Sequence, residues 1–192
     1  MSLPASVTLS NLTGKFVFNA KQSGPTEPPL KAQGVSWVTR KAIVNSTLYI
    51  TLLHKNGGAA ASGGAVEEIS AKQEVGSIGK SEEEYILTGE WAEKEHTVFK
   101  HIKAKAERVK VDQLPHAYLK QGWTASEMED GCILVESHND KDKNPNDWHA
   151  WQVWGIAEIE GERKFVRLNK LTGDNGKVDI ELRLVYDYTG PV

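Results

Sequence analysis

Three side chains in the last third of the chain have the chemistry to polarise a bound small molecule. Arg167 carries a guanidinium group, Gln152 an amide and Tyr186 a phenol. All three groups donate hydrogen bonds, and a positioned donor stabilises negative charge that develops on a carbonyl or carboxyl oxygen. They can act together only if one surface presents all of them, so the elements that carry them decide whether they form a site.

Each of the three lies in a run of alternating apolar and polar residues, the pattern of a half-buried strand. Residues 160–161 read as a two-residue turn, which pairs Arg167 with Trp154. The glycine turn 173–176 is expected to pair residues 172 and 177, which sets Arg167 opposite Leu182. The face that these two turns predict consists of Trp148, Gln152, Trp154, Phe165, Arg167, Asn169, Leu182, Leu184 and Tyr186.

This surface is mostly apolar with a few polar groups, as small-molecule pockets are. We predict catalytic roles for Arg167, Gln152 and Tyr186. The predicted substrate-binding residues are Phe18, Trp37, Trp148, Trp154, Phe165, Asn169, Leu182, Leu184.

Three alternatives stay open for this surface. The aromatic rings can simply fill a core, although each unpaired buried polar group then costs about 1–3 kcal/mol. Arg167 can stack on Trp154 as a structural cation–π pair, or it can present its guanidinium to a ligand. A one-residue error in either turn would bring His149, Trp151 and Val153 to this face instead.

Other groups with chemical potential are weaker candidates. The six histidines are scattered, so we expect no metal site and no cofactor. Cys132 is expected to be a buried, inert thiol in preference to a nucleophile activated by His138. Glu136 and His138 share a strand face and form an acid–base pair only if they point inward. The acidic run 82–84 and the segment 90–96 are expected to be charged strand edges.

Composition limits the class of protein. The chain has 192 residues, a net charge of −3 and 39% hydrophobic residues, which predicts one domain over 1–192 and excludes a polybasic nucleic-acid binder. One cysteine cannot form an internal disulfide, and the start of the chain lacks the pattern of a signal peptide. No apolar run is long enough to span a membrane. We therefore expect an intracellular, cytoplasmic protein; the sequence does not report its oligomeric state.

The order of elements predicts an all-β fold. About nine or ten strands follow one another through glycine turns, without crossover helices, so neighbouring strands are antiparallel. A meander of this length tends to close into an up-and-down barrel, and mid-sized barrels enclose a ligand. Two segments interrupt the meander. A helical lid is expected at about 30–45, and a short helical insert at about 111–130 lies on the rim or outside.

The lid segment carries a family resemblance. Residues 30–42, LKAQGVSWVTRKA, resemble the helix–turn–helix lid of intracellular fatty-acid-binding proteins, and the strand Gly14-Lys15-Phe16 precedes it as in that family. The last strand is similar to the family's closing Arg-x-Tyr strand: Tyr186 matches its tyrosine, but Leu184 stands where the family binds a carboxylate through arginine. The middle of the chain looks more like small lipocalin-like proteins of filamentous fungi. The resemblance implies a calycin-like barrel.

Two functions fit these expectations. The first is cofactor-free cyclisation or isomerisation of an apolar terpenoid or polyketide, including a Diels–Alder-type reaction, in natural-product biosynthesis. Such a reaction needs a shaped pocket and a hydrogen-bond donor. The alternative is a non-catalytic carrier of lipids or other hydrophobic ligands. A purely structural barrel is a third possibility. In the first two cases the partner is a small hydrophobic molecule, not nucleic acid or a membrane.

Overall fold

The computed structural model describes residues 2–59, 65–76, 79–140, 142–143 and 146–192. These residues form ten strands, two short α-helices and several 3-10 helices. The sequence also predicts a glycine turn over residues 56–64; its part at 60–64 lies outside the described residues, and residues 56–59 belong to β2. In chain order the elements are β1 (Gly14–Phe18), α1 (Glu27–Ala32), α2 (Trp37–Val44), β2 (Leu48–Ala59), β3 (Ala65–Val75), β4 (Gly79–Ile86), β5 (Ala92–His96), β6 (Lys100–Val109), η2 (Val111–Gln113), η3 (Ala117–Lys120), η4 (Ala125–Met128), β7 (Cys132–Asn139), β8 (Trp148–Ile159), β9 (Glu162–Gly173), η5 (Asp174–Gly176) and β10 (Val178–Gly190).

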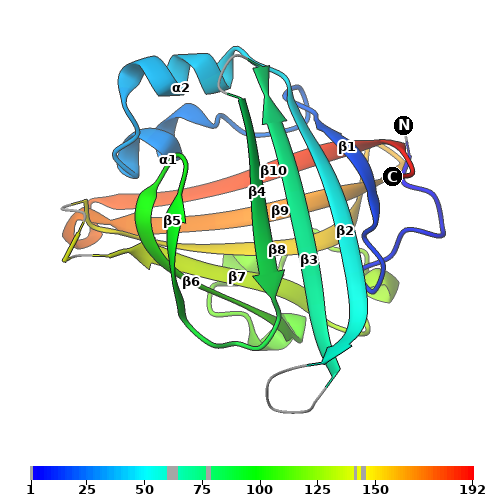
Figure 1. Cartoon of the computed structure of the whole chain (residues 1–192). Helices are drawn as coiled ribbons and strands as arrows, with labels where there is room; N and C mark the ends of the chain where they lie inside the picture. Colours follow the sequence, from blue (N-terminus) through cyan, green and yellow to red (C-terminus); the bar gives the residue numbers. More distant parts are fainter. Residues whose placement is uncertain (1, 60–64, 77–78, 141, 144–145) are drawn as a thin grey trace.

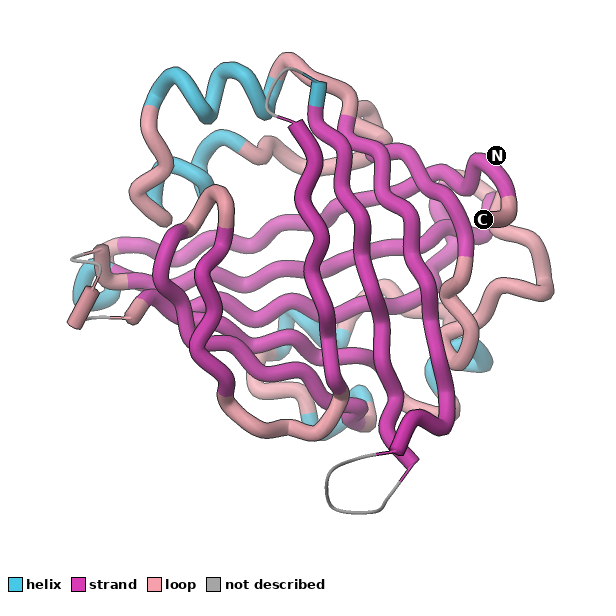
Figure 2. The backbone as a smooth tube through the Cα atoms, viewed as in Figure 1, coloured by secondary structure: helices cyan, strands magenta, loops and turns pink. Residues whose placement is uncertain are grey.

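All ten strands belong to one antiparallel sheet in the order β4-β3-β2-β1-β10-β9-β8-β7-β6-β5. The sheet curls so that strands β2–β4 run across strands β7–β10 (Figures 1 and 2). Its two end strands, β4 and β5, are joined by side chains: Lys94 Nζ donates to the Glu84 carbonyl at 2.6 Å, and His96 lies 3.0 Å from Glu83. We call this line the seam. The expected calycin-like barrel of about nine to ten strands is confirmed.

Two hairpins set the register of the strands that carry the predicted site. Glu160 and Gly161 both have positive φ, 53° and 78°, as the two-residue hairpin turn that matches strand twist requires. The expected pairing of Arg167 with Trp154 is therefore confirmed. The second hairpin differs from expectation, because Gly173 pairs with Val178 and Arg167 pairs with Leu184. The shift is two residues, so the same side chains still share a face.

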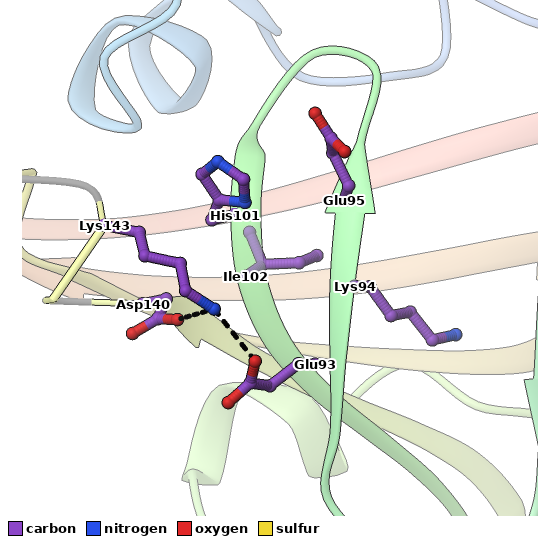
Figure 3. Close-up of a pocket in the computed structure, with 7 residues that line it drawn as sticks. All are labelled: Glu93, Lys94, Glu95, His101, Ile102, Asp140 and Lys143. Atoms are coloured by element: carbon purple, nitrogen blue, oxygen red, sulfur yellow. Dashed lines mark hydrogen bonds and ion pairs between the residues drawn. The ribbon is translucent and has the colours of Figure 1, made fainter.

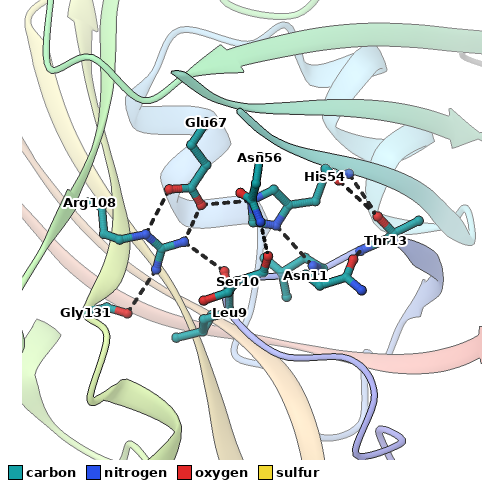
Figure 4. Close-up of polar contacts among 10 residues, drawn as sticks. Leu9, Ser10, Asn11, Thr13, His54, Asn56, Glu67, Arg108 and Gly131 are labelled. Atoms are coloured by element: carbon teal, nitrogen blue, oxygen red, sulfur yellow. Dashed lines mark hydrogen bonds and ion pairs between the residues drawn. The ribbon is translucent and has the colours of Figure 1, made fainter. Parts of the chain in front are cut away.

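The segment before β1 closes one end of the barrel. Leu9 and Leu12 are buried there. A polar network ties this segment to the strands: Arg108 donates to the Leu9 carbonyl at 2.9 Å and to Glu67, and the Leu12 N–H donates to His54 Nδ1 at 3.1 Å (Figure 4). Glu67 in turn lies 2.8 Å from His54 Nε2. The network joins β2, β3 and β6 across this end.

The lid lies at the other end, after β1, as a pair of helices (Figure 1). Neither α1 nor α2 has a buried residue. Gly34 connects them with a φ of 78°, which only glycine adopts readily. Among the described residues no helix is long and apolar enough to cross a membrane.

The insert between β6 and β7 packs against the outside of the sheet, as expected. It consists of η2, η3 and η4. Trp123 lies against Gly155, where an added Cβ would come within 2.5 Å of the indole. Val153 and Val166, which point away from the barrel interior, are buried beneath this insert. Strands β8 and β9 are thus covered on both faces, which holds the predicted site on rigid elements.

Candidate functional site

Ring contacts across the barrel identify which face of each strand points inward. Tyr85 on β4 and Trp154 on β8 lie 4.9 Å apart between ring centroids, although their strands are not neighbours in the sheet. Such a contact must cross the interior. Phe16 on β1 likewise lies 5.3 Å from Phe165 on β9. The predicted face therefore points into the barrel.

Arg167 is the buried cation of this face, with 5% of its surface exposed. Its guanidinium carbon lies 4.0 Å from the ring centroid of Trp154 and within 5.3 Å of those of Phe165 and Tyr186. The cation–π stack is thus present. However, Nε and Nη2 of Arg167 are buried and have no hydrogen-bond partner among the residues that the structure describes. Stacking uses the flat face of a guanidinium group, whereas its N–H donors point outward in the plane of the group and stay available for hydrogen bonds.

Gln152 and Asn169 stand beside Arg167 and are engaged with each other. Gln152 Nε2 donates to Asn169 Oδ1 at 2.6 Å, and Gln152 Oε1 accepts from Trp154 Nε1 at 2.6 Å. Gln152 therefore holds the indole on which Arg167 stacks. This geometry suits a positioning residue better than a donor to a ligand, and the catalytic role expected for Gln152 stays a prediction.

Tyr186 and Phe18 continue the inner face next to Arg167. Tyr186 is 2% exposed, and its ring lies 5.3 Å from Phe165 and 5.9 Å from Phe18. Burial raises the pKa of the Tyr186 phenol, and the nearby Arg167 only partly offsets this effect. Tyr186 therefore remains a protonated donor at neutral pH.

The remaining predicted binding residues are spread over a wider area. Trp148 is 2% exposed in a second apolar cluster, and its buried Nε1 has no hydrogen-bond partner in the described part of the chain. Leu184 packs against the main core. Leu182 is 6% exposed and lies against Gly24, in the segment between β1 and α1. The expectation that Trp37 lines the site is wrong: it is 63% exposed on α2, because the apolar face of this helix is not turned into the barrel.

Sequence reasoning missed a carboxylate that faces the interior, Glu83 on β4. Its Oε1 accepts hydrogen bonds from Gln73 Nε2 at 2.7 Å and from His96 Nε2 at 3.0 Å, and its Oε2 accepts from the Tyr85 hydroxyl. The prediction of charged strand edges was right for the exposed Glu82 and Glu84, which alternate with Glu83, but wrong for Glu83 itself. Alternation along β4 could have revealed it, had the strand's register been known.

The other expected chemical groups lie outside the barrel or are inert. Glu136 lies on the outer face, where its Oε1 is 2.7 Å from His149 Nε2 and where His138 also lies, so the inward acid–base pair is not formed. Burial raises the pKa of the Cys132 thiol to about 11, which fits the inert thiol. The described residues contain no group of three or more metal-ligating side chains.

Two surface pockets offer no comparable chemistry. A small one of about 140 Å³ lies beside β5, where Lys143 pairs with Glu93 at 2.9 Å and with Asp140 at 3.3 Å (Figure 3). Three of its charged side chains, Glu93, Asp140 and Lys143, therefore pair with one another. A groove of about 740 Å³ lies between the insert and the outer face of β8–β10, with Tyr118 and Trp123 on one side and Arg183 on the other. Neither pocket includes Arg167.

Comparisons with known proteins agree with this description. No family model matches the chain. A curated relative, the "Probable pericyclase scpY" of Mollisia scopiformis, is 28% identical over 190 residues, which cover 98% of this chain and 95% of the relative. Among solved structures, the wild-type fluorescent protein UnaG superposes with a TM-score of 0.55 at 13% identity, covering 93% of this chain and 97% of UnaG. A point mutant of UnaG gives a TM-score of 0.59 at 15% identity, covering 93% of this chain and 96% of the mutant. The chain therefore has a calycin-like barrel fold and is similar over nearly its whole length to a probable fungal pericyclase.

Proposed function

We propose that the barrel binds an apolar small molecule and catalyses its cofactor-independent, pericyclic-type cyclisation. The observation that carries this proposal is the pair of buried, unpartnered donors of Arg167, Nε and Nη2. An unpaired donor on a buried cation is costly, so the arrangement is best explained by a ligand oxygen that accepts from it. The similarity to a probable pericyclase supports the same function.

The interior suits a reaction that is accelerated by orientation and polarisation. A carbonyl or carboxyl oxygen at Arg167 would draw electron density away from a conjugated double bond, which activates that bond for cyclisation. The apolar rings of Trp154, Phe165 and Tyr186 would hold the reacting carbons in a folded conformation. A Diels–Alder reaction of a polyketide or terpenoid is the specific form that we propose.

The first experiment identifies the ligand. Protein purified from its own source organism is analysed by native mass spectrometry, and any bound molecule is extracted and identified. A linear polyene carbonyl compound or its cyclised product supports the proposal and supplies the substrate for turnover. A mixture of common fatty acids would instead favour the carrier function.

The second experiment assigns the role of Arg167 once a substrate is known. The variant Arg167→Met keeps an unbranched, apolar side chain but removes the guanidinium group, and with it the charge and the donors. We expect kcat to fall by about 10²–10³ and the dissociation constant to rise by a clearly smaller factor, because the donor binds the oxygen in the ground state but acts most strongly on the charge that develops during reaction. Arg183→Met, an exposed arginine on the outer face of β10, is the control and should keep full activity. Equal losses of turnover and binding in Arg167→Met would contradict the proposal.

A further inference from the structure

The barrel interior holds a second fixed charge, the carboxylate of Glu83, in addition to the guanidinium of Arg167. Among the described residues, three side chains donate hydrogen bonds to the Glu83 carboxylate: Gln73, Tyr85 and His96. They approach from β3, from β4 and across the seam from β5. The carboxylate is therefore held in one orientation by three different strands.

The hydrogen-bond geometry assigns the proton of His96. Its Nδ1 accepts from the backbone N–H groups of Val98 at 3.0 Å and Phe99 at 3.2 Å. A nitrogen that accepts two such bonds carries no proton, so the proton lies on Nε2 and is donated to Glu83. His96 is thus fixed as a donor and is not free to take a proton from a ligand.

Glu83 keeps its negative charge over the range in which proteins operate. Burial alone would raise the pKa of Glu83, but the hydrogen bonds from His96 and Tyr85 and the charge of Arg167 outweigh it and lower the pKa. Burial and the neighbouring Glu83 raise the pKa of Tyr85 well above its usual range. Both groups therefore hold their charge state and act through electrostatics, not through proton exchange.

The two fixed charges lie close to the same pair of rings without contacting each other. Arg167 stacks on Trp154 at 4.0 Å, Trp154 contacts Tyr85 at 4.9 Å, and Tyr85 donates to Glu83. Among the described residues no group, a carboxylate included, accepts a hydrogen bond from Nε or Nη2 of Arg167. Arg167 thus presents hydrogen-bond donors to the interior, and Glu83 presents hydrogen-bond acceptors.

We propose that Glu83 is a second anchor of the bound molecule, and that this molecule is a hydroxylated carbonyl compound. Its carbonyl oxygen accepts from Arg167 and its hydroxyl donates to Glu83; the inference rests on the proposed function, because it requires the carbonyl at Arg167. A carboxylate offers about four acceptor positions. Three are occupied here, and 22% of the Glu83 side chain is exposed. A neutral hydroxyl suits the remaining position, since an ammonium group would add a second cation near Arg167.

The test uses acetylnaphthalenes that carry a hydroxyl at different ring positions, each paired with its methyl ether. Dissociation constants are measured by isothermal titration calorimetry on the whole protein. We expect at least one hydroxyl isomer to bind about tenfold more tightly than its ether, as a hydrogen bond to a charged acceptor implies. The Glu83→Gln variant should lose most of that preference. The control Glu84→Gln, whose side chain is exposed on the other face of β4, should keep it.

Each outcome separates this inference from the proposed function. If every isomer binds no better than its ether, or if Glu83→Gln keeps the preference, the inference is wrong, and binding lost in Arg167→Met would still support the carbonyl site. If Arg167→Met binds all probes like wild type, the carbonyl site is wrong and so is the inference. If Glu83→Gln fails to fold, the variant Tyr85→Phe is measured in its place. Loss of the preference for the hydroxyl isomer would identify the Tyr85 hydroxyl as the acceptor and overturn the role of Glu83. Retention of that preference would support the role of Glu83.

Discussion

Glu67 belongs to the ion-pair network at the end of the barrel that the segment before β1 closes, and its pKa allows a quantitative prediction of stability. Burial would raise the pKa of Glu67, but hydrogen bonds from His54 and Arg108 and the charge of Arg108 lower it to about 2 from 4.5. The Glu67 side chain is only 20% exposed, so solvent screens the interaction little. The difference of about 2.5 pKa units corresponds to about 3 kcal/mol of stability at pH 7.

The sign of this effect follows from the lowered pKa. A carboxyl group whose pKa is lower in the folded state stabilises the fold above its unfolded pKa, and this contribution is lost as the pH falls from 4.5 towards 2. Glu67→Gln removes the charge at every pH. We therefore expect the variant to be less stable than wild type by about 3 kcal/mol at pH 7, and by about 2 kcal/mol at pH 3.5.

Urea denaturation followed by tryptophan fluorescence measures both differences. Glu68→Gln is the matched control, because this neighbour points to the opposite face of β3; its effect should stay within about 0.5 kcal/mol. A Glu67→Gln difference below about 1 kcal/mol at pH 7, or one that does not shrink at pH 3.5, would refute the reasoning that the network stabilises the folded state through an ionised Glu67.

Three further predictions concern packing and exposure. Gly155→Ala should lower the free energy of unfolding by roughly 1–3 kcal/mol, because its Cβ would meet Trp123 at 2.5 Å; adding Trp123→Leu should restore part of the loss, and strictly additive effects would argue against the contact. Burial raises the pKa of Cys132 to about 11, so we expect Ellman's reagent to react with it at pH 8 only after unfolding by urea; rapid labelling of the native protein would contradict this. Trp37→Ala should change unfolding stability by less than about 0.5 kcal/mol in thermal denaturation, since the indole is 63% exposed; a larger loss would show that the lid packs through it.

The inner face was predictable from the sequence because two short turns determined it. The turn at 160–161 has a glycine where a positive φ is needed, and it produced the observed pairing of Arg167 with Trp154. The second hairpin loop has the expected four residues but starts one residue later, at Asp174, so that Gly173 pairs with Val178. The register of this hairpin differs from the expected one by two residues, an even number, so the same side chains still face the interior.

The carboxylate side of the interior could not be predicted in the same way. Glu83 lies between two other glutamates in an end strand, and a run of identical charged residues hides the alternation that marks a buried face. Its partner His96 lies on a separate strand, β5, at the other end of the sheet. The contact between them spans the seam, and no local pattern reports such a long-range contact.

The seam between β4 and β5 also affects how one protein molecule can associate with another. Strands β4 and β5 are the unpaired ends of the sheet, and an unpaired strand edge is the usual template for adding a strand from another chain. Here the two edges face each other, linked by Lys94 to Glu84 and by His96 to Glu83. An incoming strand would have to displace these links and pass the charged outer face of β4. We therefore expect the fold to resist intermolecular strand addition, and with it aggregation, through the same contacts that hold the Glu83 carboxylate in place.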